Sequence, residues 1–159
     1  MRKLSLAFAI LFVALPLLAQ SEETRFQGYG YFGVLGSDGT TFGKLLNPGL
    51  GVDGFVYKGL AASADIGYAG YYNNFRSDGI GLFSPNASYH FLRNRKVSPF
   101  VTAGYSLAFR NSTTNMANYG AGLTYWFSNR VGLRLEGRDH VNPDNGYHMS
   151  GLRVGITFR

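Results

Sequence analysis

A charged segment near the end of the chain has the residue types of a catalytic or ion-binding site. The segment "VGLRLEGRDHVNPD" covers residues 131–144 and brings carboxylates, guanidinium groups and an imidazole together. Its first part alternates between an apolar and a charged parity: Val131, Leu133 and Leu135 against Arg134, Glu136 and Arg138. An extended strand points successive side chains to opposite faces. We therefore predict a strand with one apolar and one charged face, whose function depends on the solvent that each face meets.

Two chemical sites could be built from the residues that follow this alternation. Asp139, His140 and Ser150 have the residue types of a hydrolytic trio. A metal ion could instead be held by His140, His148 and Asp144. On a strand, however, Asp139 and His140 would point in opposite directions, which separates groups that a catalyst must bring together. We therefore predict no enzyme activity, no metal and no cofactor.

The first residues have the features of a secretory signal. Arg2 and Lys3 precede an unbroken apolar run over residues 6–14. The run is shorter than the roughly 20 apolar residues that a membrane-spanning helix needs, although a membrane anchor is the alternative. We predict a signal peptide at residues 1–19 and a barrel domain at residues 20–159. The chain has no cysteine, which excludes disulfides and cysteine-based metal or redox sites.

Turn-rich stretches divide the remaining sequence into short segments. Aromatic and β-branched residues recur in them at period two, and none shows a sustained helical spacing of apolar residues. We predict eight antiparallel strands within these segments: 25–36, 49–58, 59–72, 79–93, 96–110, 118–128, 130–139 and 148–159.

The links between these segments alternate in length. The short links are residues 57–59, 93–96 and 128–130. The longer links are residues 36–48, 73–78, 111–117 and 141–147. In outer-membrane barrels, short turns lie on the periplasmic side and longer loops lie outside. The alternation therefore predicts an up-and-down barrel with its long loops at one end.

The two faces of the segments differ in polarity. One parity carries aromatic and aliphatic side chains, and the other carries the mid-strand charges. Tyrosines and phenylalanines of the apolar parity gather near strand ends, as in the aromatic girdles of membrane barrels. Glycines of the polar parity, such as Gly51 and Gly122, are expected to leave room for long arginine and glutamate side chains. We predict an all-β, eight-stranded antiparallel up-and-down transmembrane β-barrel with lipid outside, because a closed barrel satisfies every backbone group.

Two features fit this pattern less directly. Pro85 lies in the middle of a segment and has no N–H for the ladder, so we expect a bulge or local bend there. The first strand carries Tyr29 and Tyr31 on one parity and Phe26 and Phe32 on the other. Its lipid face is therefore left open.

The predicted interior charges are balanced in sign. They are three acids and three bases: Asp53, Asp65 and Glu136 with Arg134, Arg138 and Arg153. Charges held away from water must be paired, and hairpin pairing across residues 141–147 would place Glu136 among three guanidinium groups. The lumen of an eight-stranded barrel is narrow enough for side chains to fill. We therefore predict a structural network that plugs the lumen, with a selectivity constriction for small ions as the alternative.

The sequence resembles the small outer-membrane β-barrel family that includes the OmpA membrane domain and OmpX. The resemblance rests on the signal peptide, the eight alternating segments and the last strand, "GLRVGITFR", with Gly155 and the near-terminal aromatic Phe158. It implies that Gly155 and Phe158 belong to a signal read by the barrel assembly machinery. The segments "VSPFVTAGYSLAF" and "NYGAGLTYWFSNRVGLR" are also similar to eight-stranded lipid A deacylases. Their His-x-Ser motif would fall near Arg138 and Asp139, which do not supply that chemistry.

These observations predict a monomer in the outer membrane of a Gram-negative bacterium, with a structural or surface-contact role. Its partners would be outer-membrane lipids, the assembly machinery and a surface ligand bound by the loops. Arginine and lysine residues gather on the short-turn side, but no face of the sequence pattern combines them with aromatic residues on which nucleobases could stack. We therefore predict no nucleic-acid partner. Glu136 and Arg138 are expected in the lumen, and Asp139 and His140 at the external rim. The alternative functions are a narrow channel for small ions or solutes and a lipid-modifying enzyme.

Overall fold

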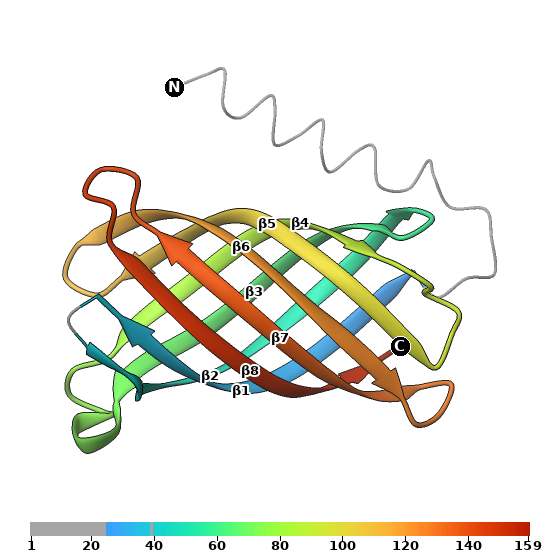
Figure 1. Cartoon of the computed structure of the whole chain (residues 1–159), viewed down its shortest axis with the longest axis horizontal. Coiled ribbons are helices and arrows are strands. Elements are labelled where there is room, and N and C mark those ends of the chain that lie inside the picture. The colour runs from blue at the N-terminus through green and yellow to red at the C-terminus, as the bar shows by residue number, and fades with distance from the viewer. Residues whose placement is uncertain (1–24, 39) are drawn as a thin grey trace.

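Eight antiparallel strands close into a barrel in chain order, with the last strand paired to the first (Figure 1). The computed structural model describes residues 25–38 and 40–159, so the predicted signal peptide, residues 1–19, lies outside the described residues. The strands are β1 (Phe26–Ser37), β2 (Thr40–Tyr57), β3 (Leu60–Tyr71), β4 (Ile80–His90), β5 (Val97–Phe109), β6 (Thr113–Trp126), β7 (Val131–Val141) and β8 (His148–Phe158). The predicted eight-stranded, all-β, up-and-down architecture is confirmed.

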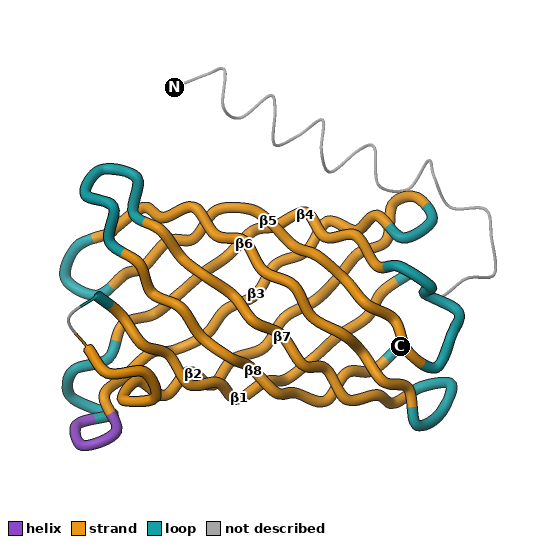
Figure 2. Tube along the Cα trace, viewed as in Figure 1, coloured by secondary structure: helices purple, strands orange, loops and turns teal. Residues whose placement is uncertain are grey.

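The connections between strands gather at the two ends of the barrel (Figure 2). One end, called the loop end, holds the connection between Ser37 and Thr40 and three others: residues 72–79, 110–112 and 142–147. The other, called the terminus end, holds Arg159 and three connections: residues 58–59, 91–96 and 127–130. The first of the longer loop-end connections contains the 3-10 helix η2 (Tyr72–Asn74). Among the described residues, no helix is long and apolar enough to cross a membrane.

The predicted difference in link length is wrong for two of the loop-end connections. β1 and β2 stay paired out to Ser37 and Thr40, and β5 and β6 out to Phe109 and Thr113. Most residues of two predicted loops therefore belong to strands: 36–48 and 111–117. The two strands of a hairpin can form backbone hydrogen bonds with each other even where the neighbouring strands of the barrel have ended. Threonine, which occurs at both hairpin ends, also has a high β propensity.

The two faces of the wall follow the predicted parities. Val154 is 46% exposed, whereas its neighbour Arg153 is 4% exposed. The first strand, which the sequence left open, turns Phe26 and Phe32 outward and buries Tyr29. Exposed aromatic side chains form one band near each end of the barrel: Tyr57, Phe91, Phe127 and Phe158 at the terminus end, and Tyr71, Tyr105, Phe109 and Tyr119 at the loop end.

The bulge expected at Pro85 is absent. The β3–β4 ladder runs through Pro85 without a shift, and the β4–β5 register is the same on both sides of it, at Phe83 and Asn86. Pairing with β5 instead lapses at Ser84 and Pro85, where the Ser84 hydroxyl lies 2.9 Å from the Ser106 hydroxyl. The exposed proline thus leaves a gap in one ladder, which a side-chain hydrogen bond bridges inside the lumen.

Candidate functional site

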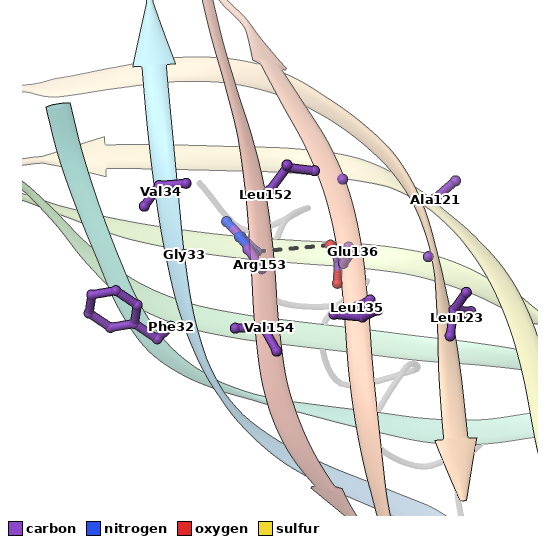
Figure 3. Close-up of a pocket in the computed structure, with 12 residues that line it drawn as sticks. Phe32, Gly33, Val34, Ala121, Leu123, Leu135, Glu136, Leu152, Arg153 and Val154 are labelled. Carbon is purple, nitrogen blue, oxygen red and sulfur yellow. Dashed lines mark ion pairs between the residues drawn. The ribbon is translucent and has the colours of Figure 1, made fainter. Parts of the chain in front are cut away.

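The lumen is crossed by a network of buried ion pairs centred on Glu136. Its Oε2 accepts a hydrogen bond from Nε of Arg134 at 3.2 Å, and its Oε1 accepts one from Nε of Arg138 at 2.5 Å. Arg153 pairs with Glu136 across the β7–β8 hairpin and brings Nη1 to 4.0 Å from the same carboxylate (Figure 3). Glu136 therefore lies among three guanidinium groups.

Two carboxylates from β2 and β3 complete the network. Asp53 accepts a hydrogen bond from Nη1 of Arg134 at 2.8 Å. Asp65 accepts from Nη1 of Arg138 at 2.6 Å and from Nη1 of Arg153 at 3.3 Å. None of the six charged side chains is more than 4% exposed. The structure thus brings the six predicted lumen residues together and joins β2 and β3 to β7 and β8 through the interior.

Aromatic rings flank two of the guanidinium groups. The Arg134 guanidinium carbon lies 4.1 Å from the ring centroid of Tyr29 and 3.9 Å from that of Phe100. The Arg153 group lies 4.6 Å from the Tyr31 centroid. A cation over a ring face is attracted by the ring quadrupole, and more strongly when both are desolvated. The rings therefore supply attraction that the carboxylates alone do not.

The glycines that face the lumen make room mainly for these aromatic rings, so the expectation that they make room for charged side chains is corrected. A Cβ at Gly51 would lie 2.3 Å from the Tyr29 ring, and a Cβ at Gly122 would lie 2.5 Å from the Phe100 ring. The sequence pattern predicts that this space holds arginine and glutamate side chains. Tyrosine and phenylalanine need more width close to the wall, because their rings begin one bond beyond Cβ.

His140 lies in the lumen and not at the rim, so that prediction is wrong. β7 continues to Val141, and the alternation of the strand sends Asp139 outward and His140 inward. The His140 ring contacts the Ser106 hydroxyl through Nδ1 at 2.9 Å and Arg153 Nη2 through Nε2 at 3.4 Å. Because arginine only donates, Nε2 is the acceptor and Nδ1 carries the proton. His140 is thus a neutral member of the lumen network.

An apolar plug closes the lumen at the loop end, a feature that the sequence analysis did not predict. Its members are buried inward-facing side chains: Leu35, Leu45, Ala69, Leu82, Ala108, Met116 and Met149. The signal was present in the sequence, since Met116 and Met149 share the inward parity of their strands. The lumen therefore has a charged middle and an apolar end.

We expect Leu82→Ala to lower the free energy of unfolding by about 2–5 kcal/mol, because Leu82 is fully buried in this plug and its truncation leaves a cavity. Urea unfolding in detergent micelles measures the loss. Leu123→Ala is the matched control, since Leu123 faces outward and leaves no internal cavity. Equal losses in the two variants would show that the plug is not packed.

The outer surface of β6, β7 and β8 carries a second cluster at the loop end. Asp139 accepts a hydrogen bond from Ser150 Oγ at 2.7 Å and another from Tyr119 at 2.8 Å. His148 Nδ1 also contacts Asp139, at 2.8 Å. The carboxylate lies between the hydroxyl and the imidazole, so the Ser150 hydroxyl donates its hydrogen bond to Asp139. An activated serine nucleophile would instead donate to the histidine.

Neither chemical site considered from the sequence is assembled as proposed. His140 is buried behind the wall, whereas Ser150 and His148 are exposed on its outer side. Asp144 is exposed in the connection over residues 142–147. Within residues 25–38 and 40–159, no group of three histidine, cysteine, aspartate or glutamate side chains is placed to hold a metal ion.

Gly155 and Phe158 face opposite sides of β8. Phe158 is exposed on the outer surface, and Gly155 packs inward against Tyr31. A Cβ at Gly155 would lie 2.3 Å from the backbone oxygen of Gly30, at the seam where β8 meets β1. The seam requires a glycine at this position, whereas a role in assembly signalling stays a prediction.

Comparison with known proteins places the fold among the small outer-membrane barrels. The chain matches no family model and no curated protein sequence. Among solved structures it is similar to Neisserial surface protein A, with a TM-score of 0.70, 15% identity, and coverage of 85% of this chain and 97% of that one. It is also similar to the N-terminal barrel of Pseudomonas aeruginosa OprF, with a TM-score of 0.63, 23% identity, and coverage of 85% and 98%.

The attachment invasion locus protein Ail of Yersinia pestis is a third similar structure, with a TM-score of 0.60, 14% identity, and coverage of 84% and 95%. At these identities the likeness concerns the fold. The protein therefore has the closed, eight-stranded transmembrane barrel fold of the small outer-membrane barrels, as the sequence resemblance implied.

Proposed function

We propose that the protein is a monomeric, integral outer-membrane barrel with a sealed lumen and a structural or surface-contact role. The observation that carries this proposal is the interior, where the six charges are paired with one another and buried. The space enclosed by Tyr29, Tyr31, Arg134, Glu136 and Arg153 has no volume for a water molecule. The apolar plug then covers the loop end.

The terminus end supports an orientation toward the periplasm. Its bases are Arg25, Lys58, Arg93, Arg95, Lys96, Arg130 and Arg159. The described residues of that end include no acidic side chain. Long basic side chains can extend along the apolar wall to anionic lipid headgroups. Arg159 also lies over the Trp126 ring at 4.1 Å, which helps to close this end.

Surface contact would fall to residues 72–79 and 142–147, the two longer loop-end connections. Ail has been solved in complex with the heparin analogue sucrose octasulfate. The loop end of this chain does not favour an anionic ligand, since its acids outnumber its bases among the described residues, four to three: Asp38, Asp78, Asp139 and Asp144 against Lys44, Arg76 and Arg110. We therefore infer a contact surface of neutral, hydrogen-bonding chemistry.

Membrane fractionation tests the proposed location. We expect the protein in the outer-membrane fraction, with a gel mobility that changes after heating because the closed barrel stays compact until it is heated. A protein that remains in the periplasmic fraction, or whose mobility does not change, would contradict an integral outer-membrane barrel.

A narrow channel is the second candidate, and one observation favours it. Several buried lumen atoms have no hydrogen-bond partner within the part of the chain that the structure describes, among them Asp53 Oδ1, Arg153 Nε, Asn118 Oδ1 and Thr124 Oγ1. Buried polar atoms of this kind are commonly satisfied by internal water. A channel predicts steady currents across a planar bilayer that change when Arg134 is replaced by alanine.

A further inference from the structure

An apolar groove of about 510 Å³ lies on the outer face of the barrel, over β6, β7, β8 and β1 (Figure 3). Its walls include Phe32, Leu123, Leu135 and Val154. Its floor is open at Gly137, where a Cβ would find no atom closer than Leu152 Cδ2 at 3.6 Å. The groove therefore exists because an outward position of a lipid-facing strand carries no side chain.

The groove leads directly to the outer polar cluster. Gly137 is paired with Ala121 on β6 and Leu152 on β8. On the same outward face, the next residue of β7 toward the loop end is Asp139, which is paired with Tyr119 and Ser150. The apolar groove and the outer polar cluster are therefore adjacent along the same three strands.

The cluster retains capacity for a ligand. The His148 side chain is 47% exposed and that of Asp139 is 16% exposed. Nδ1 of His148 is engaged with Asp139, whereas Nε2 has no partner among the described residues. A carboxylate and a ring nitrogen accept hydrogen bonds from hydroxyl or amide groups. No arginine or lysine of residues 25–38 and 40–159 is paired with Asp139, so the cluster does not offer the cationic donors that a phosphate prefers.

We propose that the groove and the cluster together bind one acylated glycolipid of the outer leaflet. Its acyl chain occupies the groove over Gly137, and its sugar hydroxyl or amide hydrogens bond to Asp139 and His148. The inference rests on the proposed function, because it requires the barrel to lie in a membrane with the loop end outward. It adds to that function a lipid class and a place on the wall.

Native mass spectrometry of the purified full chain, released from micelles with added lipid, tests the site. The probes are N-myristoylglucosamine and a phosphatidylglycerol with the same acyl chain. We expect the wild type to retain the glycolipid in preference to the phospholipid. Gly137→Phe fills the groove and should reduce glycolipid retention by about tenfold, which corresponds to about 1.4 kcal/mol.

The matched control is Gly28→Phe, since Gly28 is also partly exposed on the wall with no atom within 4 Å of its Cβ. Gly28 lies outside the groove, so this variant should retain the glycolipid. Asp139→Asn changes no volume and should abolish the preference for glycolipid while leaving phospholipid retention unchanged. This second variant keeps the test valid if Gly137→Phe fails to fold.

Equal retention by Gly137→Phe and Gly28→Phe, or an unchanged preference in Asp139→Asn, would overturn the site. Release of free fatty acid by the wild type would also overturn it, because the cluster would then be hydrolytic. Variants that lose the lipid but keep the heat-dependent change in mobility leave the proposed membrane location intact. Failure of this inference is therefore distinguishable from failure of the proposed function.

Discussion

Glu136→Gln is expected to lower the free energy of unfolding by about 3–5 kcal/mol, the range for breaking a buried ion pair from one side. Glu136 holds both Arg134 and Arg138, and all three side chains are buried. Glutamine has nearly the same shape but removes the negative charge, so the lumen retains an uncompensated guanidinium group. Urea unfolding of the purified barrel in micelles measures the loss.

Asp78→Asn is the matched control for this change. Asp78 pairs with Arg110 at 3.5 Å, and the two side chains are 49% and 45% exposed. Exposed ion pairs contribute roughly 0–1 kcal/mol, because water and salt screen them. If Glu136→Gln cost no more than Asp78→Asn, the lumen charges would be solvated and the description of a sealed network would be wrong.

Gly155→Val is expected to prevent closure of the barrel, with a loss of about 3 kcal/mol or more from overpacking. A Cβ at this position would lie 2.3 Å from the Gly30 backbone oxygen and 3.0 Å from Tyr31 Cβ. Backbone at the β1–β8 seam cannot move without breaking the ladder that closes the wall. The measurement is refolding into micelles, followed by gel mobility with and without heating.

Gly137→Val serves as the control, because Gly137 lies on the same hairpin but faces open space on the outer wall. We expect this variant to refold like the wild type. Refolding without the assembly machinery separates packing from signalling. A Gly155→Val chain that refolds in micelles but fails to assemble in cells would assign Gly155 to the assembly signal instead of the seam.

Residue parity explains why the wall could be predicted from the sequence. A strand has a side-chain period of two, so the run Leu133, Arg134, Leu135 and Glu136 shows which face is apolar and which is charged. This assignment does not require knowing which strands pair with it. Hairpin register was also accessible, since β7 and β8 are consecutive strands joined by a single connection, and their pairing opposes Glu136 to Arg153. The pairs Asp53–Arg134 and Asp65–Arg138 depend on the closure of the whole barrel, which no local pattern encodes.

The errors arose where a strand continues beyond its strongest pattern. His140 was assigned to the rim because the apolar alternation of β7 stops before it, although pairing with β8 extends the strand to Val141. The same extension brings Asp139 opposite Ser150 and creates the outer cluster. The apolar plug does not follow from parity as directly, because Leu35 lies on the first strand, whose faces the sequence leaves open, and apolar residues such as Leu82 interrupt the polar parity of their strands.

Single-channel recording in planar bilayers tests the sealed lumen most directly. We expect no steady current from the wild type, because charged pairs fill the middle of the lumen and apolar side chains close its loop end. Arg134→Ala and Glu136→Ala should each leave this baseline unchanged while the plug is in place. Steady wild-type currents whose conductance changes in either variant would contradict the sealed barrel and establish a channel.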